Sequence, residues 1–467
     1  MPFPPSVANE RPAPSPGALP RGQHALPPEE VAAEHRQRLL AAAVQLAAEQ
    51  GCRSLTVADV TRRARVSRGA FYAVFPNLFA CLETAFREEA QRLAAVARDA
   101  WSAARSDRLT AMIGAGLQAI DDDPAAARFV FVEFPTMGVE AAEARARLLP
   151  GLAAQWSEAT ARARVDLRLL AVLGAVQKIV AARLRLPEPP PMVELADDLR
   201  TWVRTYLVSS PARVRTRGRA RSSYHAVTAP ATRPPLRPLP PGPRARESPA
   251  VAEDQRERIL IAMADAIAEH GYARTSIREI VGRARVSRQT FYAHFTDKHA
   301  CFRAAFRLGT QRTIGASWAG YSSAPEGAWA EGVLAGLHAY LVYLGRESGF
   351  ARLGFVEAIA AGHDTAIAFD QGVDAFAMFL APSYELDPRT ATLPRLCSEA
   401  IAGAICELAV QRVLAGRAHE LPSLLPEVAH LALTPFLGAT PTHRAITAWM
   451  RTPPATATPA PPAAPAP

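Results

Sequence analysis

Two short segments of this chain place side chains that could bind DNA at helical spacing. In one segment, Arg288 can donate two hydrogen bonds to guanine, Gln289 can pair with adenine, and the hydroxyl of Tyr292 can reach a phosphate. The other segment has Arg68 and Tyr72 at the matching positions, with glycine in place of the glutamine. Both segments therefore have a composition suited to insertion into a major groove.

These side chains need a short helix that is held by apolar residues on its opposite face. Phe71 and Phe75, and likewise Phe291 and Phe295, are four residues apart and so share one face of a helix. We expect these rings to pack against two preceding helices and to leave arginine, glutamine and tyrosine outside. The alternative is an ordinary amphipathic helix whose polar side is only hydrated. This interpretation is less favoured because the same pattern occurs in both copies.

The residues before each segment have the pattern of two further helices. The stretch 36–50 and its counterpart carry an apolar stripe and end at a glycine, which can adopt the positive φ that terminates a helix. Thr56 with Asp59, and Ser276 with Glu279, have the spacing of capping boxes that begin the second helix. Two short helices joined by a tight turn form a helix-turn-helix.

The two segments belong to a long internal repeat. Residues 36–87 align with residues 256–307 without a gap, and 22 of the 52 aligned positions are identical. A repeat of this length is far longer than a solenoid unit, so each copy is expected to be a domain-sized unit.

Positive charge is concentrated in the repeated segments and between them. Residues 33–93 carry a net charge of +3 and residues 253–313 carry +4, while 211–250 contains nine arginines and one glutamate. The whole chain carries +9, so the remainder is acidic. Such clustering favours a polyanionic partner, and the partner predicted here is double-stranded DNA.

We expect an all-α chain made of two tandem units, each with a three-helix DNA-binding head and a helical regulatory domain. The boundaries follow from Pro-rich and Arg-rich stretches that lack helical periodicity. In chain order the predicted parts are a disordered Pro-rich arm (1–30), a first helix-turn-helix domain (33–93), a first helical regulatory domain (94–208), an Arg/Pro-rich linker (209–250), a second helix-turn-helix domain (253–313), a second helical regulatory domain (314–440) and a Pro/Ala-rich tail (441–467).

Both heads resemble the N-terminal helix-turn-helix of the TetR/AcrR family of transcriptional regulators. The resemblance rests on Gly51, Thr56, Ala64, Val66, Ser67, Arg68, Phe71, Tyr72 and Phe75, and on Gly271, Ser276, Ala284, Val286, Ser287, Arg288, Phe291, Tyr292 and Phe295. A weaker recurrence of Ala171–Val176 as Ala400–Ile405 is similar to the family's C-terminal domain, which binds an inducer and dimerises through a four-helix bundle. The resemblance implies a transcriptional regulator, more commonly a repressor released by a small-molecule effector than an activator.

The resemblance also assigns DNA-facing positions. They are Thr56, Ser67, Arg68, Gly69, Ala70, Tyr72 and Val74 in the first head, and Ser276, Ser287, Arg288, Gln289, Thr290, Tyr292, His294 and Lys298 in the second. The family's usual phosphate-contacting lysine is present as Lys298 but is replaced by Leu78, so the first head is expected to bind DNA less tightly and to read fewer bases. Arg65 and Arg285 stand where the family commonly has glycine. If these positions keep a positive φ, arginine costs about 1 kcal/mol or more, and a slightly rearranged turn would avoid that cost.

Two copies in one chain imply a pairing that differs from the family's usual one. Family members act as homodimers on palindromic operators whose half-sites lie about 34–36 Å apart. This chain could fold instead as an intramolecular pseudo-dimer on an asymmetric operator, since a flexible linker of about 40 residues spans roughly 35 Å. A homodimer of chains, or a vestigial first head that serves only dimerisation, are the alternatives. Arg217-Gly218-Arg219 in the linker resembles a minor-groove AT-hook that lacks its usual proline, and non-specific attraction to phosphates explains this run of arginines equally well.

An enzyme is the less favoured class. The sequence has no GxSxG, HExxH, P-loop or Rossmann motif. Glu133 and Glu357 recur between the copies, and we expect them to be packing carboxylates that bond nearby backbone rather than catalytic bases. The five cysteines lack metal-ligand spacing, so buried thiols are expected and neither a metal nor a cofactor is predicted.

An apolar small-molecule effector is a further expected partner. Aromatic residues that could line its pocket are Trp101, Phe131, Phe134 and Trp156 in the first copy and Trp318, Trp329, Tyr340 and Phe355 in the second. Plain core packing is the more common role of such residues. The chain has neither a signal-like N-terminus nor an apolar run long enough to span a bilayer, so we expect no membrane partner and a cytoplasmic, nucleoid-associated location.

Overall fold

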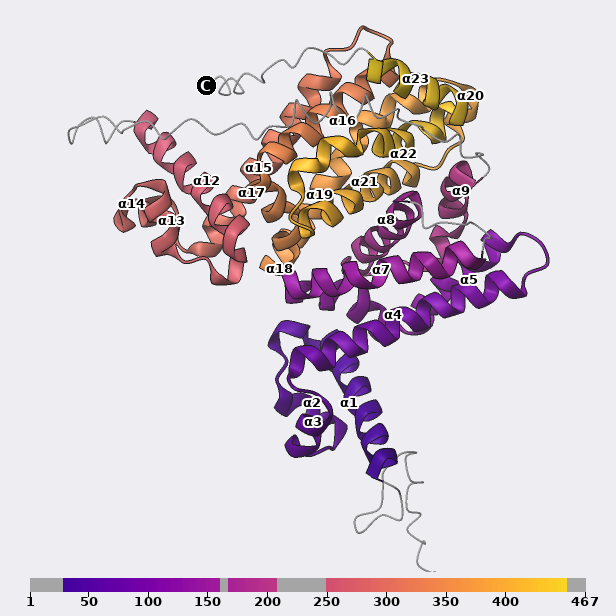
Figure 1. Cartoon of the computed structure of the whole chain (residues 1–467), viewed down its shortest axis with the longest axis vertical. Helices are drawn as coiled ribbons and strands as arrows, with labels where there is room; N and C mark the ends of the chain where they lie inside the picture. The colour runs from indigo at the N-terminus through magenta and orange to yellow at the C-terminus, as the bar shows by residue number, and fades with distance from the viewer. Residues whose placement is uncertain (1–27, 160–166, 208–248, 452–467) are drawn as a thin grey trace, which may run out of the picture.

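The computed structural model describes residues 28–159, 167–207 and 249–451, and every regular element in these ranges is a helix (Figure 1). The all-α prediction is confirmed. Most of the predicted arm, most of the linker with its AT-hook-like segment, and the residues after 451 lie outside these ranges.

Copy 1 comprises residues 28–207. Its head, head 1, contains α1 (Pro28–Gln50), the single turn η1 (Cys52–Ser54), α2 (Val57–Ala64) and α3 (Arg68–Val74). Its regulatory domain contains α4 (Leu78–Ala103), α5 (Arg108–Asp122), α6 (Pro124–Arg128), the π-helical η2 (Phe129–Glu133), η3 (Phe134–Met137), α7 (Val139–Ala159), α8 (Leu167–Leu184), η4 (Met192–Leu195) and α9 (Ala196–Leu207).

Copy 2 comprises residues 249–451. Its head, head 2, contains α12 (Pro249–Arg274), α13 (Ile277–Ala284) and α14 (Arg288–His294). Its regulatory domain contains α15 (Lys298–Tyr321), α16 (Trp329–Arg346), α17 (Ser348–Arg352), the π-helical η5 (Leu353–Glu357), α18 (Ala358–Ala361), α19 (His363–Ala375), η6 (Phe376–Glu385), α20 (Pro388–Ala391), α21 (Leu396–Leu414), η7 (Ala418–Leu424), α22 (Leu425–Leu437) and α23 (Ala439–Arg451).

The last helix corrects one predicted boundary. Helix α23 crosses residue 440, where the sequence led us to expect the Pro/Ala-rich tail to begin, and continues to Arg451. Ile446 is buried, and the ring of Trp449 lies 5.1 Å from that of His338 on α16. Burial of this apolar face stabilises the helix, and a proline in the first turn of a helix breaks no intrahelical hydrogen bond.

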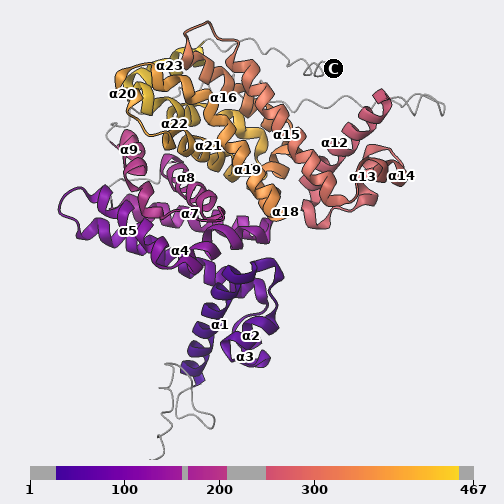
Figure 2. The ribbon, with the colours of Figure 1, turned by 180° about the vertical axis from the view of Figure 1, so that it is seen from behind.

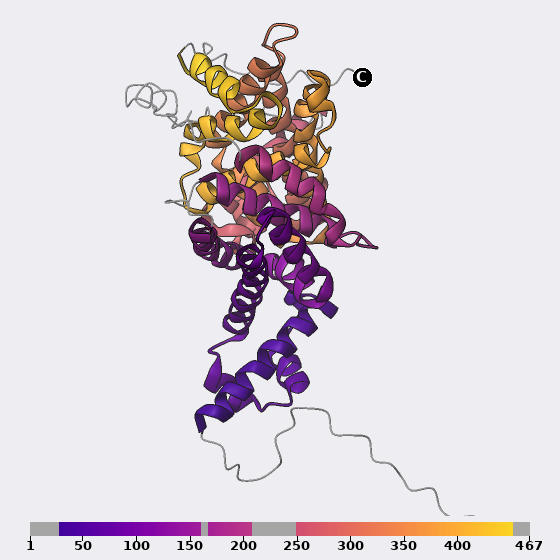
Figure 3. The ribbon, with the colours of Figure 1, turned by 90° about the vertical axis from the view of Figure 1, so that its right-hand side faces the viewer.

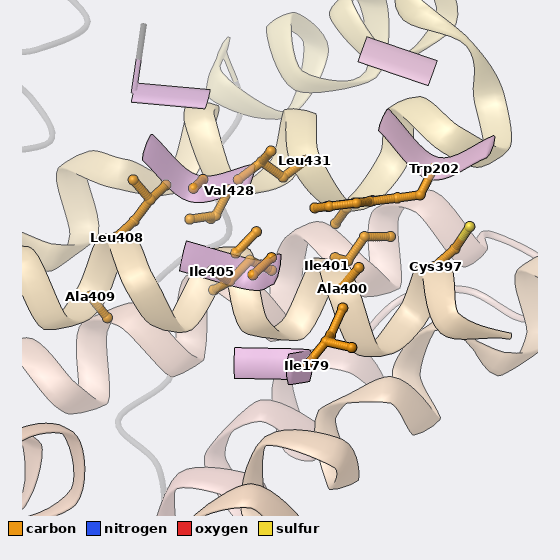
Figure 4. Packing of buried hydrophobic residues seen from close by; sticks show 14 of the residues in the cluster. Ile179, Trp202, Cys397, Ala400, Ile401, Ile405, Leu408, Ala409, Val428 and Leu431 are labelled. Carbon is orange, nitrogen blue, oxygen red and sulfur yellow. The ribbon is translucent and has the colours of Figure 1, made fainter. Parts of the chain in front are cut away.

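The regulatory domains of the two copies share one hydrophobic core. Helices α8 and α9 of copy 1 pack against α21 and α22 of copy 2. Figure 4 shows Ile179 and Trp202 of copy 1 among Ile401, Ile405 and Leu431 of copy 2. Each head, in contrast, belongs to a cluster of its own, which also includes residues of the regulatory domain that follows it. The two copies are therefore joined through their regulatory domains.

The heads project from this shared body on either side of α18 (Figures 1 and 2). Head 1 extends well away from the body in the side view (Figure 3). Near α18 the copies touch directly, because the guanidinium of Arg53 in head 1 donates a hydrogen bond of 2.5 Å to the carbonyl of Ala360.

The five cysteines are buried free thiols, as predicted. Burial raises the pKa of Cys52, Cys81, Cys301 and Cys397 to about 12. These side chains act as small core residues.

Within the described ranges no single helix is long and apolar enough to cross a membrane, although α3 and α4, which meet at a bend of 61°, pass that test as a pair.

Candidate nucleic-acid interface

The second helix of each head begins at a side-chain cap. In head 1 the hydroxyl of Thr56 accepts from the Asp59 N–H (3.2 Å) and the Asp59 carboxylate accepts from the Thr56 N–H (3.1 Å), which completes the predicted capping box. In head 2 Ser276 accepts from the Glu279 N–H (3.2 Å), but the carboxylate of Glu279 accepts from Arg283 (3.0 Å) instead. Only head 1 therefore has the reciprocal box.

The turn between the second and third helices keeps the left-handed conformation in both heads. Arg65 has φ 53° and ψ 44°, and Arg285 has φ 54° and ψ 45°. The turn is thus not rearranged to avoid the arginine, and the strain predicted for a side chain at this φ is present twice. In head 1 the guanidinium of Arg38 donates to the carbonyl of Ala64 (2.5 Å), which satisfies one of the exposed carbonyls at the end of α2.

The third helix of each head is capped by serine, as predicted. The hydroxyl of Ser67 accepts from the Ala70 N–H (3.1 Å), and that of Ser287 accepts from the Thr290 N–H (2.9 Å). Both serines are exposed. A capping hydroxyl keeps its own hydrogen, so that of Ser67 can still donate to a phosphate, whereas in head 2 the hydroxyls of Ser287 and Thr290 lie 2.8 Å apart and either can donate to the other.

Aromatic residues hold the third helix in the manner expected from their spacing. Phe71 and Phe291 are fully buried, at 0% exposure, whereas Tyr72 is 57% exposed and Tyr292 is 47% exposed. The ring of each buried phenylalanine lies edge-on to the neighbouring tyrosine, with centroids 5.3 and 5.5 Å apart. The ring contacts orient the tyrosine, so its hydroxyl faces solvent on a rigid helix.

The predicted DNA-facing residues lie on the outer side of the heads with graded exposure. The exposed ones are Thr56, Ser67, Arg68, Gly69, Tyr72, Ser276, Ser287, Arg288, Gln289 and Tyr292, and the half-buried ones are Ala70, Val74, Thr290, His294 and Lys298. In head 2 the guanidinium of Arg288 lies 5.7 Å from the ring of Tyr292. Burial, together with the charge of Arg256, lowers the pKa of His294 and so favours the neutral ring.

Lys298 has a structural role that its sequence position did not reveal. Its ammonium donates to the carbonyls of Tyr272 (3.0 Å) and Thr275 (3.1 Å) and lies 4.3 Å from the ring of Tyr272. The lysine therefore ties the start of α15 to the segment after the kink in α12 and has one N–H left for a phosphate. In head 1 Leu78 instead packs against the core.

The turn arginines are further candidates for phosphate contact. Arg65 and Arg285 are exposed and directly precede the third helix. In the sequence they stand out only as residues that would be strained at a positive φ. The signal that could have revealed them was their recurrence in the RARVSR segment, which places a cation beside each predicted reading helix.

Two matched carboxylates connect the regulatory domains to the heads. Glu357 is buried and accepts from the backbone N–H of Tyr272, which confirms the expected packing role. Its Oε1 is so close that a methyl group on Gly271 would lie 3.0 Å away. Glu133 lies similarly against Gly51 and pairs with Arg128 at 3.1 Å. Burial raises the pKa of both carboxylates.

An apolar cavity of about 110 Å³ lies inside the regulatory domain of copy 2. Tyr340 and Phe355, two of the aromatic residues singled out in the sequence, line it. Two of its lining hydroxyls are already bonded, since Thr313 donates to the Gly309 carbonyl (2.7 Å) and Ser317 to the Thr313 carbonyl (2.9 Å), and most of the other lining side chains are apolar. The cavity therefore suits an uncharged, apolar molecule.

The other aromatic residues from the sequence lie elsewhere. Trp329 is buried and donates to the Phe379 carbonyl (3.1 Å), and Trp318 is 51% exposed. Phe131 and Phe134 line a different hollow, of about 80 Å³, between the copies. Trp101 is half-buried against the shared core, and the side chain of Trp156 lies outside the described part.

Comparisons with known proteins bear on both heads. Residues 39–83 and 259–305 each match the bacterial regulatory proteins of the tetR family. No curated protein matches the chain. Among solved structures, the chain is similar to the fatty acid degradation regulator FadR from Bacillus halodurans, with 19% identity, a TM-score of 0.35, and coverage of 38% of this chain and 94% of that one. It is also similar to a TetR-like transcriptional regulator from Rhodococcus sp. RHA1, with 21% identity, a TM-score of 0.29, and coverage of 38% and 96%.

Proposed function

The chain is a tandem member of the tetR family of bacterial regulatory proteins, and on this premise we propose that its two heads read the two halves of one asymmetric operator. As a member of this family it is a transcription factor rather than an enzyme. The main support for the proposal is that two heads with the same helices and anchoring residues occur in one chain, whose regulatory domains share one core. The outer face of one head presents Gln289, and that of the other presents Gly69.

The pairing of the copies supports a single chain as the DNA-binding unit. Family dimers bring two identical heads to two half-sites about 34–36 Å apart. Here α8 and α9 pack against α21 and α22, so the domains that carry the two heads contact each other within one chain, which supports the proposal. Covalent linkage makes that pairing independent of protein concentration. The operator then has unlike halves because the heads present unlike side chains.

Base-resolved footprinting of a bound genomic fragment tests this proposal. We expect one chain to protect two adjacent half-sites, and binding to weaken as salt is raised. Gln289→Ala is expected to relax base preference at one position of one half-site, by about 1–3 kcal/mol. Equal changes in both half-sites, or protection of a single half-site by the wild-type chain, would count against the proposal.

We propose further that the regulator is a repressor released by an apolar effector that binds in the cavity of copy 2. The cavity is enclosed by α15, α16, α19 and α21, and α15 begins at Lys298 in head 2. A ligand that moves α15 would therefore change the position of that head. Leu337→Trp, which fills the cavity, is expected to abolish release of DNA by apolar compounds, whereas Leu186→Trp at an exposed site is expected to preserve it. Release that survives Leu337→Trp would place the effector elsewhere.

A regulator of genomic DNA acts at the nucleoid in the cytoplasm, and we propose this location for the chain. Imaging of a fluorescent fusion tests it, because DNA binding predicts a signal that coincides with stained DNA and disperses when Arg68 and Arg288 are both replaced by alanine. A signal at the cell envelope would contradict the proposed location.

A further inference from the structure

The interface between the two copies joins unlike charges in one direction only. Among the described residues, three ion pairs cross it, and in each of them copy 1 supplies the arginine and copy 2 the carboxylate. The pairs are Arg145 with Glu407, Arg183 with Glu399, and Arg185 with Asp370. The Arg183–Glu399 pair is bidentate, with distances of 3.0 and 2.8 Å. A symmetric dimer would instead use the same charges on both sides.

The most buried of these groups is Glu407, whose side chain is 0% exposed. Burial by itself would raise the pKa of Glu407, but Arg145 and the Gln411 amide, together with the charge of Lys178, hold it below its ordinary value. Its side chain lies directly on the backbone of Gly174, where a Cβ would be 2.2 Å from the Glu407 Cγ. A charge this deep must have a cation beside it, because an unpaired buried carboxylate is strongly unfavourable.

The internal repeat shows which residue of copy 1 corresponds to Glu407. The alignment that places Gly174 on Gly403 places Lys178 on Glu407. The side chain of Lys178 lies close to the backbone of Gly403 in a similar way, since a Cβ on Gly403 would lie 3.6 Å from the Lys178 Cδ. Lys178 and Glu407 are thus counterparts of opposite charge, and each crosses to the other copy.

The partners of these two residues are also counterparts. Gly138 and Gly362 both have positive φ and precede α7 and α19, and this alignment places Arg145 on Phe369. The ammonium of Lys178 lies 4.2 Å from the centroid of the Phe369 ring. One side of the interface therefore pairs a cation with a carboxylate, and the other pairs a cation with an aromatic face, which is also favourable.

Neither favourable arrangement survives if two like copies pair in the same geometry. In a pair of two copies 1, the Arg145 of each copy would face the Lys178 of the other. This brings four cations into a half-buried interface. Two copies 2 would place Glu407 against Phe369 twice, which leaves two buried carboxylates without a cation and facing the negative face of a ring. The Arg183–Glu399 site is less selective, because Arg412 stands in copy 2 where copy 1 has Arg183.

We propose that this charge arrangement makes the interface specific for one copy 1 and one copy 2. The partner that copy 1 accepts is a surface with a buried carboxylate at the position of Glu407, and the partner that it rejects is a second copy 1. The inference rests on the proposed pseudo-dimer and adds the residues that make copy 1 pair with copy 2. If copy 1 paired with copy 1 and copy 2 with copy 2, chains would associate into open-ended assemblies. A preference for unlike copies avoids this association.

Exchange of partners in cleaved protein tests the specificity. A protease site is placed within residues 209–248 of the full chain, the purified protein is cleaved, and isotopically labelled and unlabelled samples are mixed and followed by native mass spectrometry. We expect complexes of one copy 1 with one copy 2, with like pairs at a few per cent or less, whereas random pairing gives like pairs in about half of the complexes. A random mixture would overturn the proposal.

Two substitutions are designed to create like pairs rather than to break the native one. Lys178→Glu gives copy 1 both an arginine at 145 and a carboxylate at the position equivalent to Glu407, so pairs of two copies 1 are expected to appear. Phe369→Arg does the same for copy 2. Arg62→Glu, with the same change of charge as Lys178→Glu but on the exposed surface of head 1, serves as the matched control and is expected to leave partner choice unchanged. Failure of both designed variants to produce like pairs would show that these residues do not select the partner.

The same samples separate this inference from the proposed function. Operator binding by the uncleaved wild-type chain is measured in parallel. If copy 1 pairs only with copy 2 but the chain does not bind DNA, only the proposed function is contradicted. If the chain binds DNA but the copies pair at random, only the inference about partner choice is contradicted.

Discussion

In head 1 the residue after Arg68 is a glycine, whereas in head 2 the residue after Arg288 is a glutamine, although α3 and α14 have the same length, caps and aromatic anchors. The buried phenylalanine, the left-handed arginine and the capping serine recur in each head. On the outer face and its edge the heads differ at the positions of Gln289 and Lys298. The two heads therefore share a scaffold and differ in what they offer to DNA.

The two heads show how a duplicated DNA-binding unit can diverge. Interior positions have also diverged, since Ala43 corresponds to Met263 and Leu82 to Phe302, but these buried pairs stay apolar, so close packing can be kept when neighbouring side chains change with them. Outer positions change at little cost to stability, so the two heads can come to read different bases. The interface between the regulatory domains has diverged in a third way, by placing opposite charges at corresponding positions.

The comparison predicts that the shared scaffold is equally important in both heads. Phe71→Ala and Phe291→Ala each remove a fully buried ring, and we expect each to destabilise its own head by about 3–5 kcal/mol. Hydrogen exchange of amides in α1–α3 and α12–α14 measures this head by head. A loss of protection in one head with little change in the other, for the matched substitution, would show that the heads do not share the same internal design.

The next prediction tests whether head 1 binds DNA at all. Arg68→Ala and Arg288→Ala each remove an exposed guanidinium from the reading helix, and each is expected to weaken operator binding by about 1–3 kcal/mol. The larger loss is expected from Arg288, which acts beside Gln289. Titration of a labelled operator with each variant measures the difference. If Arg68→Ala has no effect, head 1 is vestigial and serves only to pair the copies.

The scaffold of each head could be predicted from the sequence because its signals are local. Caps at Thr56, Ser67 and Ser287 follow from residue type and spacing, and the structure has them. The anchoring role of Phe71 follows from helical periodicity in the same way. One capping return bond was predicted wrongly, since the carboxylate of Glu279 pairs with Arg283, four residues later on the same helix, instead of returning to the Ser276 N–H.

The parts that could not be predicted depend on residues that are distant in the sequence. The structural role of Lys298 requires the carbonyl of Tyr272, and the seat of Glu407 requires Arg145, which is 262 positions away. The sequence named aromatic candidates for a pocket, but only packing in three dimensions decides that Tyr340 lines a cavity while Trp329 lies in the core. Periodicity also missed α23, whose apolar face is stabilised by contact with α16 and α22, which are distant in the sequence or separated from it by a turn.

A smaller effect is expected at the aligned position that is Lys298 in head 2 and Leu78 in head 1. Lys298→Leu removes two hydrogen bonds to backbone carbonyls, so we expect a loss of about 1–2 kcal/mol in the stability of head 2. If the remaining N–H contacts a phosphate, the slope of the logarithm of affinity against the logarithm of salt concentration falls by about 1. Leu78→Lys provides the reciprocal variant in head 1. An unchanged salt slope in Lys298→Leu would limit this lysine to its structural role.

The smallest expected effect concerns the strained turn that the heads have in common. Arg65 and Arg285 both hold a left-handed φ, which costs a residue with a side chain about 1 kcal/mol relative to glycine. Arg65→Gly and Arg285→Gly relieve that strain, but the added freedom of the unfolded chain offsets part of the gain, so we expect each head to gain less than about 1 kcal/mol. Because each change also removes an exposed guanidinium next to the reading helix, operator affinity is expected to fall while stability rises. Arg65→Ala and Arg285→Ala are the matched controls, since they remove the charge without relieving the strain. Hydrogen exchange and operator titration on the same samples separate the two quantities, and a glycine variant that binds DNA as tightly as the wild type would show that these arginines do not contact phosphate.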